Sequence, residues 1–143
     1  MDLEELNVYR LSMDMGERVW AVVIKWDFFA KDTIGKQLVR AADSVSANLS
    51  EGFGRFFYKE SKQFCYYSRG SLYETKTFLN KAYNRCLISK EEYECFVADI
   101  KTIGIKLNNY IKSIGKSLDN SMVKDDSVTY GNALYSAIDL EEI

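Results

Sequence analysis

The feature that most constrains this chain is the recurrence of apolar side chains every three or four residues. The most regular seam, spaced 3, 4, 3, 4, 3 and 4, consists of Tyr93, Phe96, Ile100, Ile103, Leu107, Tyr110 and Ile114. This period is that of an α-helix that buries one face. Proline is absent from the chain, and no period-two alternation extends over a strand length before residue 116. The pattern therefore predicts an all-α protein.

Four segments carry seams of this kind. We predict one helix over residues 3–29 and a polar break at 30–33, with Thr33 as the N-cap of the next helix. The second helix is expected to end between 51 and 57, and the third seam runs over residues 61–82. Small residues in the second segment are expected to let a neighbouring helix approach closely.

The fourth helix has recognisable ends. Ser89 followed three residues later by Glu92 forms the pattern of a capping box, and Gly115 is a natural C-terminal stop. Helices joined by short links must bury their apolar stripes against one another. The simplest arrangement is an antiparallel up-down-up-down four-helix bundle, which we expect over residues 1–116.

Residues 117–143 differ in composition. They hold one lysine and six acidic residues among scattered Ser, Asn and Gly. We expect a flexible acidic tail. One alternative stays open, in which Leu134, Ala137 and Ile138 form a short amphipathic turn that docks on a partner or on the bundle itself.

The composition excludes several kinds of chemistry. The chain has no histidine, and its cysteines (Cys65, Cys86 and Cys95) form no CxxC pair, so His-dependent catalysis and the usual zinc sites are ruled out. We expect reduced thiols in a cytoplasmic protein, no cofactor, no metal and no enzymatic activity. The acidic N-terminus is unlike a signal peptide. Lys25 and Asp27 interrupt the longest apolar stretch, so no membrane span is expected.

Charge is segregated along the chain. Residues 57–88 hold six basic side chains against two acidic ones, a net charge of +4. This predicts either an ordinary solvated helix face or a binding site for RNA or DNA, with Tyr66, Tyr67 and Tyr73 available to stack on bases. The candidate binding residues are Arg40, Arg55, Lys59, Lys62, Arg69 and Lys76.

The most informative motif is Gln37–Arg55, which reads QLVRAADSVSANLSEGFGR. It resembles the central motif of the four helix bundle protein family, bacterial proteins first noticed as reading frames inside intervening sequences of large-subunit ribosomal RNA genes. The resemblance continues through Phe64 and residues 68–74. It ends with residues 87–93, which look like the family's link between the third and fourth helices.

The resemblance implies a four-helix bundle that assembles into a ring-like homopentamer. A related branch is the accessory variability determinant of diversity-generating retroelements, a basic pentameric barrel that binds nucleic acid and a reverse transcriptase. By resemblance, a reverse transcriptase or another nucleic-acid enzyme is therefore a candidate partner. This chain departs from that branch because its formal net charge is −2.

The polar residues of the motif form a stripe on the second helix, with Arg40, Ser44, Asn48, Glu51 and Arg55 spaced 4, 4, 3 and 4. We expect Arg40, Ser44, Asn48 and Glu51 to build a hydrogen-bonded network between helices or subunits. Arg40 and Arg55 on a partner-binding surface are the alternative.

The third helix is expected to contribute Arg69 and Glu74 to this network, since their charges are complementary. Gly52 and Gly54 are expected to bend or end the second helix. Gly70 and Ser71 are expected to allow close helix contact. Trp20 and Trp26, with Phe28 and Phe29, are expected in the core or at a subunit interface.

Three functions follow as hypotheses. The first is a non-catalytic, homopentameric scaffold. The second is nucleic-acid binding through the second and third helices. The third is a protein-binding adaptor that uses Leu134–Ile143 as a docking segment and binds no nucleic acid.

Overall fold

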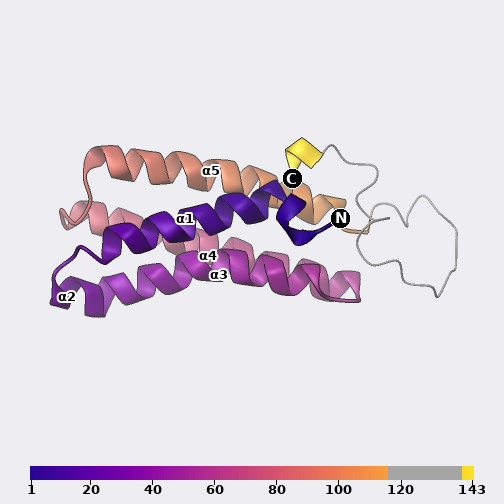
Figure 1. Cartoon of the computed structure of the whole chain (residues 1–143), viewed down its shortest axis with the longest axis horizontal. Coiled ribbons are helices and arrows are strands. Elements are labelled where there is room, and N and C mark those ends of the chain that lie inside the picture. Colours follow the sequence, from indigo (N-terminus) through magenta and orange to yellow (C-terminus); the bar gives the residue numbers. More distant parts are fainter. Residues whose placement is uncertain (116–139) are drawn as a thin grey trace, which may run out of the picture.

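The computed structural model describes residues 1–115 and 140–143 (Figure 1). Within these residues the chain forms helices and no strand. The long helices are α1 (Asn7–Val23), α3 (Lys36–Phe53), α4 (Tyr58–Asn84) and α5 (Lys90–Ser113); the short elements are η1 (Leu3–Glu5), α2 (Phe28–Ala30), the π-helical turn η2 (Lys31–Gly35) and η3 (Leu140–Glu142). The predicted all-α four-helix bundle is confirmed.

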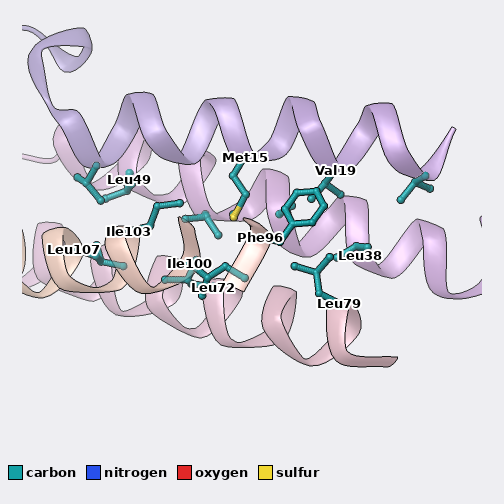
Figure 2. Packing of buried hydrophobic residues seen from close by; sticks show 14 of the residues in the cluster. Met15, Val19, Leu38, Leu49, Leu72, Leu79, Phe96, Ile100, Ile103 and Leu107 are labelled. Atoms are coloured by element: carbon teal, nitrogen blue, oxygen red, sulfur yellow. The ribbon is translucent and has the colours of Figure 1, made fainter. Parts of the chain in front are cut away.

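The long helices lie antiparallel, with α1 beside α3, α3 beside α4, α4 beside α5 and α5 beside α1 (Figure 1). Their apolar faces converge on one core. Figure 2 shows this core with side chains from all of them, among which are Met15, Val19, Leu38, Leu49, Leu72, Leu79, Phe96, Ile100, Ile103 and Leu107.

The first helix is shorter than predicted. It ends at Val23, and the chain then bends before α2, η2 and α3 follow as one helical stretch. The break lies before α2 and not at 30–33, because Asp27 caps the new helix by accepting a hydrogen bond from the Ala30 N–H at 2.9 Å. Thr33, the expected N-cap, donates its hydroxyl to Phe29 O instead. Gly35 is required here, since a Cβ would lie 2.8 Å from Val23 Cγ1.

Helices α3 and α4 approach each other closely, as the small residues of the second segment predicted. Ser68 Oγ donates to Val45 O across the interface at 2.7 Å. A Cβ on Gly52 would lie 2.9 Å from the backbone oxygen of Ser61. Gly52 therefore permits close packing rather than a bend, whereas Gly54 is the C-cap that ends α3.

Interactions between residues close in the sequence end α4 and mark both ends of α5. Cys86 follows α4 with φ of 59°, and the Leu87 N–H reaches back to Ala82 O at 2.9 Å, which is a Schellman-type ending on a residue other than glycine. The predicted capping box is confirmed: the Glu92 N–H donates to Ser89 Oγ at 3.1 Å, and the Ser89 N–H to Glu92 Oε1 at 3.0 Å. Gly115, with φ of 88°, follows α5.

The last residues of the chain pack on the bundle beside the N-terminus (Figure 1). Ile143 is fully buried, and its backbone oxygen accepts the Val8 N–H at 2.7 Å. Lys106 and Asn109 on α5 donate to the backbone oxygens of Glu141 and Glu142. Residues 140–143, part of the expected tail, are thus joined to α1 and α5. Leu134, Ala137 and Ile138 lie outside the described residues, and the boundary at 116 stays a prediction.

Candidate functional site

Basic and tyrosine side chains alternate along one side of α4. Lys59, Lys62, Tyr66, Arg69, Tyr73 and Lys76 are spaced 3, 4, 3, 4 and 3, and we call this set the α4 stripe. Residues three and four apart are neighbours on a helix surface. The stripe lies beside the face of α4 that buries Cys65, Leu72 and Leu79. Its tyrosines stay accessible, with Tyr66 42% and Tyr73 66% exposed.

Arg69 is held in place by two neighbours. Its guanidinium carbon lies 5.0 Å from the centre of the Tyr66 ring, and its Nη1 donates to Asn108 Oδ1 of α5 at 3.2 Å. The ring face attracts the cation, and the amide fixes its orientation. Arg69 thus contacts α5 and its own stripe rather than serving the expected network with Glu74, which is exposed.

The contact with Asn108 also shows the register between α4 and α5. Because the helices are antiparallel, the residue seven positions after Arg69 on α4 lies level with the residue seven positions before Asn108 on α5. Lys76 is therefore level with Lys101, and Lys112 lies toward the Tyr66 end. The exposed residues Lys101, Ile105, Asn108 and Lys112 share one side of α5, at spacings of 4, 3 and 4. Together with the α4 stripe they form what we call the α4–α5 basic face.

Lys101 and Lys112 are not among the binding residues predicted from the sequence. Residues 89–116 hold five basic and four acidic side chains, which nearly cancel. The acids, however, lie at positions 91, 92, 94 and 99, and Asp99 is paired with Arg18 of α1 at 2.6 Å. The spacing from 101 to 112 was a usable signal, but only the α4–α5 register shows that these lysines extend the stripe.

Arg55 and Arg40 occupy different places. Arg55 pairs with Glu51, and its guanidinium carbon lies 4.8 Å from the centre of the Phe64 ring. It lines a shallow pocket of about 350 Å³ together with Lys59 and Tyr67. Arg40 lies 15 residues earlier on α3, about 22 Å along the axis. The structure brings Arg55 close to the α4 stripe and leaves Arg40 apart from it.

The motif residues of α3 bond mainly within their own helix. Ser44 Oγ donates to Arg40 O at 2.6 Å, and Asn48 Nδ2 donates to Ser44 O at 2.9 Å. These contacts lie within α3 because a side chain four residues along a helix is nearer than the next helix, and the expected network between helices or subunits stays a prediction. The hydrogen bond that does join α3 and α4 comes from Ser68, which the network prediction did not include.

Gly70 also departs from expectation. It is exposed, and within residues 1–115 and 140–143 a Cβ built on it would meet nothing inside 4 Å. Close helix contact within the chain therefore does not explain this glycine. Its partner in the motif, Ser71, is half-buried and accepts the Thr75 hydroxyl through its backbone oxygen at 2.8 Å.

A second surface lies at the opposite end of the bundle from the termini. Trp20, Ile24, Phe28 and Phe29 are between 53% and 79% exposed, and we call them the α1–α2 aromatic surface. The first three of these side chains line a pocket of about 450 Å³ with Val39 of α3. Arg40 and the Lys36–Asp32 ion pair of 2.6 Å border it. Trp26, by contrast, is buried in the core.

The titratable groups with altered pKa values lie away from both surfaces. Burial raises the pKa of the Cys65 thiol to about 12, which keeps it protonated and unreactive. Burial, and then the charge of Glu17, raise the pKa of Asp43. Over residues 1–115 and 140–143, no three Cys, Asp or Glu side chains gather as a metal site would need. No helix in this part of the chain is long and apolar enough to cross a bilayer.

Comparisons with known proteins agree with the fold. The model of a family described as 23S rRNA-intervening sequence protein matches residues 4–109. A crystal structure from Bacteroides thetaiotaomicron, of a protein with unknown function from the S23 ribosomal protein family, superposes with a TM-score of 0.66. It shares 21% identity, covering 73% of this chain and 98% of the other, and this likeness concerns the fold alone. No curated protein matches. The chain belongs to the 23S rRNA-intervening sequence protein family.

Proposed function

We propose that the protein is a non-catalytic scaffold that self-associates through the α1–α2 aromatic surface. The observation that carries this proposal is the exposure of Trp20, Ile24 and Phe28 around one apolar pocket, with the exposed Phe29 next to them in the chain. Contiguous apolar surface of this kind is unfavourable in water and marks interaction sites. Support for a homopentamer comes from the resemblance of the motif, since an exposed apolar surface by itself sets no subunit number.

The assembly is tested by light scattering coupled to size exclusion. We expect the wild-type protein to elute at five times the chain mass at micromolar concentration. The double variant Trp20→Gln, Phe28→Gln should elute at a lower mass with unchanged helical circular dichroism. The control is Met13→Gln, an exposed apolar residue elsewhere on α1, which should keep the assembly. A monomeric wild-type protein would show the proposal to be wrong.

We further propose that the scaffold binds nucleic acid through the α4 stripe. The favouring observation is the alignment of Lys59, Lys62, Arg69 and Lys76 on one side of α4, extended by Lys101 and Lys112. Clustered cations on one face attract the phosphate backbone. A nucleic-acid enzyme such as a reverse transcriptase stays a candidate partner, supported by the resemblance alone.

This binding is tested by its salt dependence. Replacing Lys62, Arg69 and Lys76 by alanine should weaken binding and lower the log–log salt slope by about 0.7 for each lost single-strand phosphate contact. Replacing Arg10, Lys25 and Lys90 by alanine removes the same charge from other positions and should leave the slope unchanged. Binding that is absent at low salt, or equal in both triple variants, would contradict the proposal.

The adaptor role through Leu134–Ile143 is the alternative. Its last four residues are engaged by α1 and α5 of the same chain, so a partner would have to displace them. Deleting residues 117–143 without loss of any partner would exclude this role.

A further inference from the structure

We propose that the α4–α5 basic face recognises single-stranded nucleic acid by stacking bases on Tyr66 and Tyr73. The inference deepens the proposed nucleic-acid role and rests on it. Cations attract phosphates of any nucleic acid, so the stripe alone does not choose between single strands and duplexes. Three features of the face favour a single strand.

The first feature is the placement of the tyrosines among the cations. Tyr66 lies between Lys62 and Arg69, and Tyr73 between Arg69 and Lys76. Each ring is thus flanked by side chains that can hold phosphates. Alternating cationic and aromatic groups are the features by which single strands are bound without sequence preference, because every base has a ring face that can stack.

The second feature is the open position at Gly70. It lies four residues after Tyr66 and three before Tyr73, and therefore between the two rings on the same side of α4. The rings start from positions about 10 Å apart along the helix, and none of the residues that the structure describes occupies the space that a Cβ at Gly70 would face. A glycine here is unfavourable for the helix. It leaves room for a base or a sugar to reach the helix backbone.

The third feature is the width of the face. Asn108 of α5 contacts Arg69, so α5 lies level with the stripe. Two packed helices present a surface about 20 Å wide, whereas the major groove of B-DNA is about 12 Å wide and accepts one helix. The pair cannot enter the groove together, and the bases of a duplex hide their ring faces from Tyr66 and Tyr73. A single strand meets neither obstacle.

The side-chain arrangement assigns separate roles within the face. Arg69, positioned by the Tyr66 ring and by Asn108, is placed to bind a phosphate next to a base stacked on that ring. Lys62, Lys76, Lys101 and Lys112 border the tyrosines on both helices. Ile105, 55% exposed on α5, offers an apolar contact near Tyr73.

Fluorescence anisotropy with the full-length protein tests the inference. The probes are labelled dT20, an abasic 20-mer with the same number of phosphates, and a 20-base-pair duplex, all at the same moderate salt concentration. We expect dT20 to bind at least tenfold more tightly than the abasic strand and more tightly than the duplex. Tyr66→Ala and Tyr73→Ala should each weaken dT20 binding about fivefold or more, with an unchanged salt slope, since no charge is lost.

Matched variants separate stacking from other effects. Tyr66→Phe and Tyr73→Phe should bind dT20 as the wild type does, because the ring is kept. Gly70→Leu should weaken dT20 binding by filling the open position, and Gly70→Ala should change it less. Circular dichroism and the assembly mass of each variant show whether the fold and the subunit number are intact.

The outcomes are distinguishable. If no probe binds at low salt, the proposed nucleic-acid role and this inference both fail. If dT20 and the abasic strand bind equally and the alanine variants have no effect, the stacking inference is wrong while a purely electrostatic role stands. Tighter binding of the duplex would also overturn it. A changed assembly mass in Tyr66→Ala or Tyr73→Ala would identify the face as a contact between subunits and overturn the inference.

Discussion

Gly52 and Gly70 lie on opposite sides of the α3–α4 hairpin and have opposite surroundings. Gly52 is buried where the backbone of α4 leaves no room for a Cβ, whereas Gly70 is exposed with open space in front of it. Both lie inside helices, where glycine is unfavourable by about 1 kcal/mol relative to alanine. The packing of this chain explains the first glycine, whereas the proposed nucleic-acid contact is our explanation for the second. We call the crowded side of the hairpin around Gly52 the inner face and the exposed side around Gly70 the outer face.

The largest expected effect is that of Gly52→Ala. The new Cβ would lie 2.9 Å from the Ser61 backbone oxygen and 3.0 Å from Phe64 Cβ, so α4 must move away from α3. Overpacking of this kind outweighs the gain in helix propensity, and we expect a net loss of about 2 kcal/mol. Urea unfolding followed by circular dichroism at fixed protein concentration measures it. Unchanged stability would mean that the inner face is not tightly packed.

The pH dependence of Cys65 also tests the inner face. Its folded pKa of about 12 lies above the ordinary cysteine value of 9.0, so the unfolded chain loses this proton first as the pH rises. The contribution of this thiol to stability is present below pH 9 and is lost progressively between pH 9 and 12. Between pH 8 and 10, the wild type should lose about 1.4 kcal/mol more than Cys65→Ala.

Thiol labelling is the independent check on that prediction. Cys86 and Cys95 are exposed and Cys65 is buried. A thiol reagent should therefore modify the first two rapidly in the folded protein and Cys65 only on unfolding. Rapid reaction of all the cysteines would contradict the burial of Cys65.

On the outer face, replacing a glycine by alanine should stabilise the protein, whereas on the inner face it should destabilise it. Gly70→Ala introduces a Cβ into open space and removes the conformational freedom of a glycine in mid-helix. We expect the free energy of unfolding to rise by about 1 kcal/mol. Chemical unfolding in the same series as Gly52→Ala measures the contrast directly, and a destabilised Gly70→Ala protein would show that this face is already covered.

The smallest effect is expected at the exposed polar stripe of α3. Glu51 and Arg55 form an ion pair four residues apart, and both side chains are at least 40% exposed. Pairs of this kind contribute about 0.3–0.5 kcal/mol, so Glu51→Gln should lower stability by no more than that. Asp32→Asn, which breaks the similar pair with Lys36, is the control. A loss of several kcal/mol for Glu51→Gln alone would indicate the hydrogen-bonded network between helices or subunits that the motif predicts.

Local signals predicted the parts of the fold that depend on neighbouring residues. The seam from Tyr93 to Ile114 and the capping box at Ser89 are both present. The end of the first helix was misplaced because apolar residues continue past Val23, and the capping carboxylate of Asp27, although visible in the sequence, was not recognised as the stronger signal. Local propensity and tertiary contacts compete at such a boundary.

The candidate site was predicted less completely. The cations and tyrosines of α4 were recognisable from their spacing, whereas Lys101 and Lys112 join them only through the register that Arg69 and Asn108 report. The roles of Gly52 and Gly70 were likewise indistinguishable in the sequence. They differ in whether another helix packs against the glycine, and only the tertiary structure shows this.

The spacing of apolar side chains, the helix caps and the net charge of each segment can be recognised from residues close together in the chain. These signals alone determined that the chain forms an all-α bundle with a basic third long helix. The tertiary structure decided which faces meet, which glycine is crowded, and that Ile143 returns to cap α1. The reason is that these properties depend on the relative position of helices far apart in the chain, set by the packing of whole faces rather than by any local pattern.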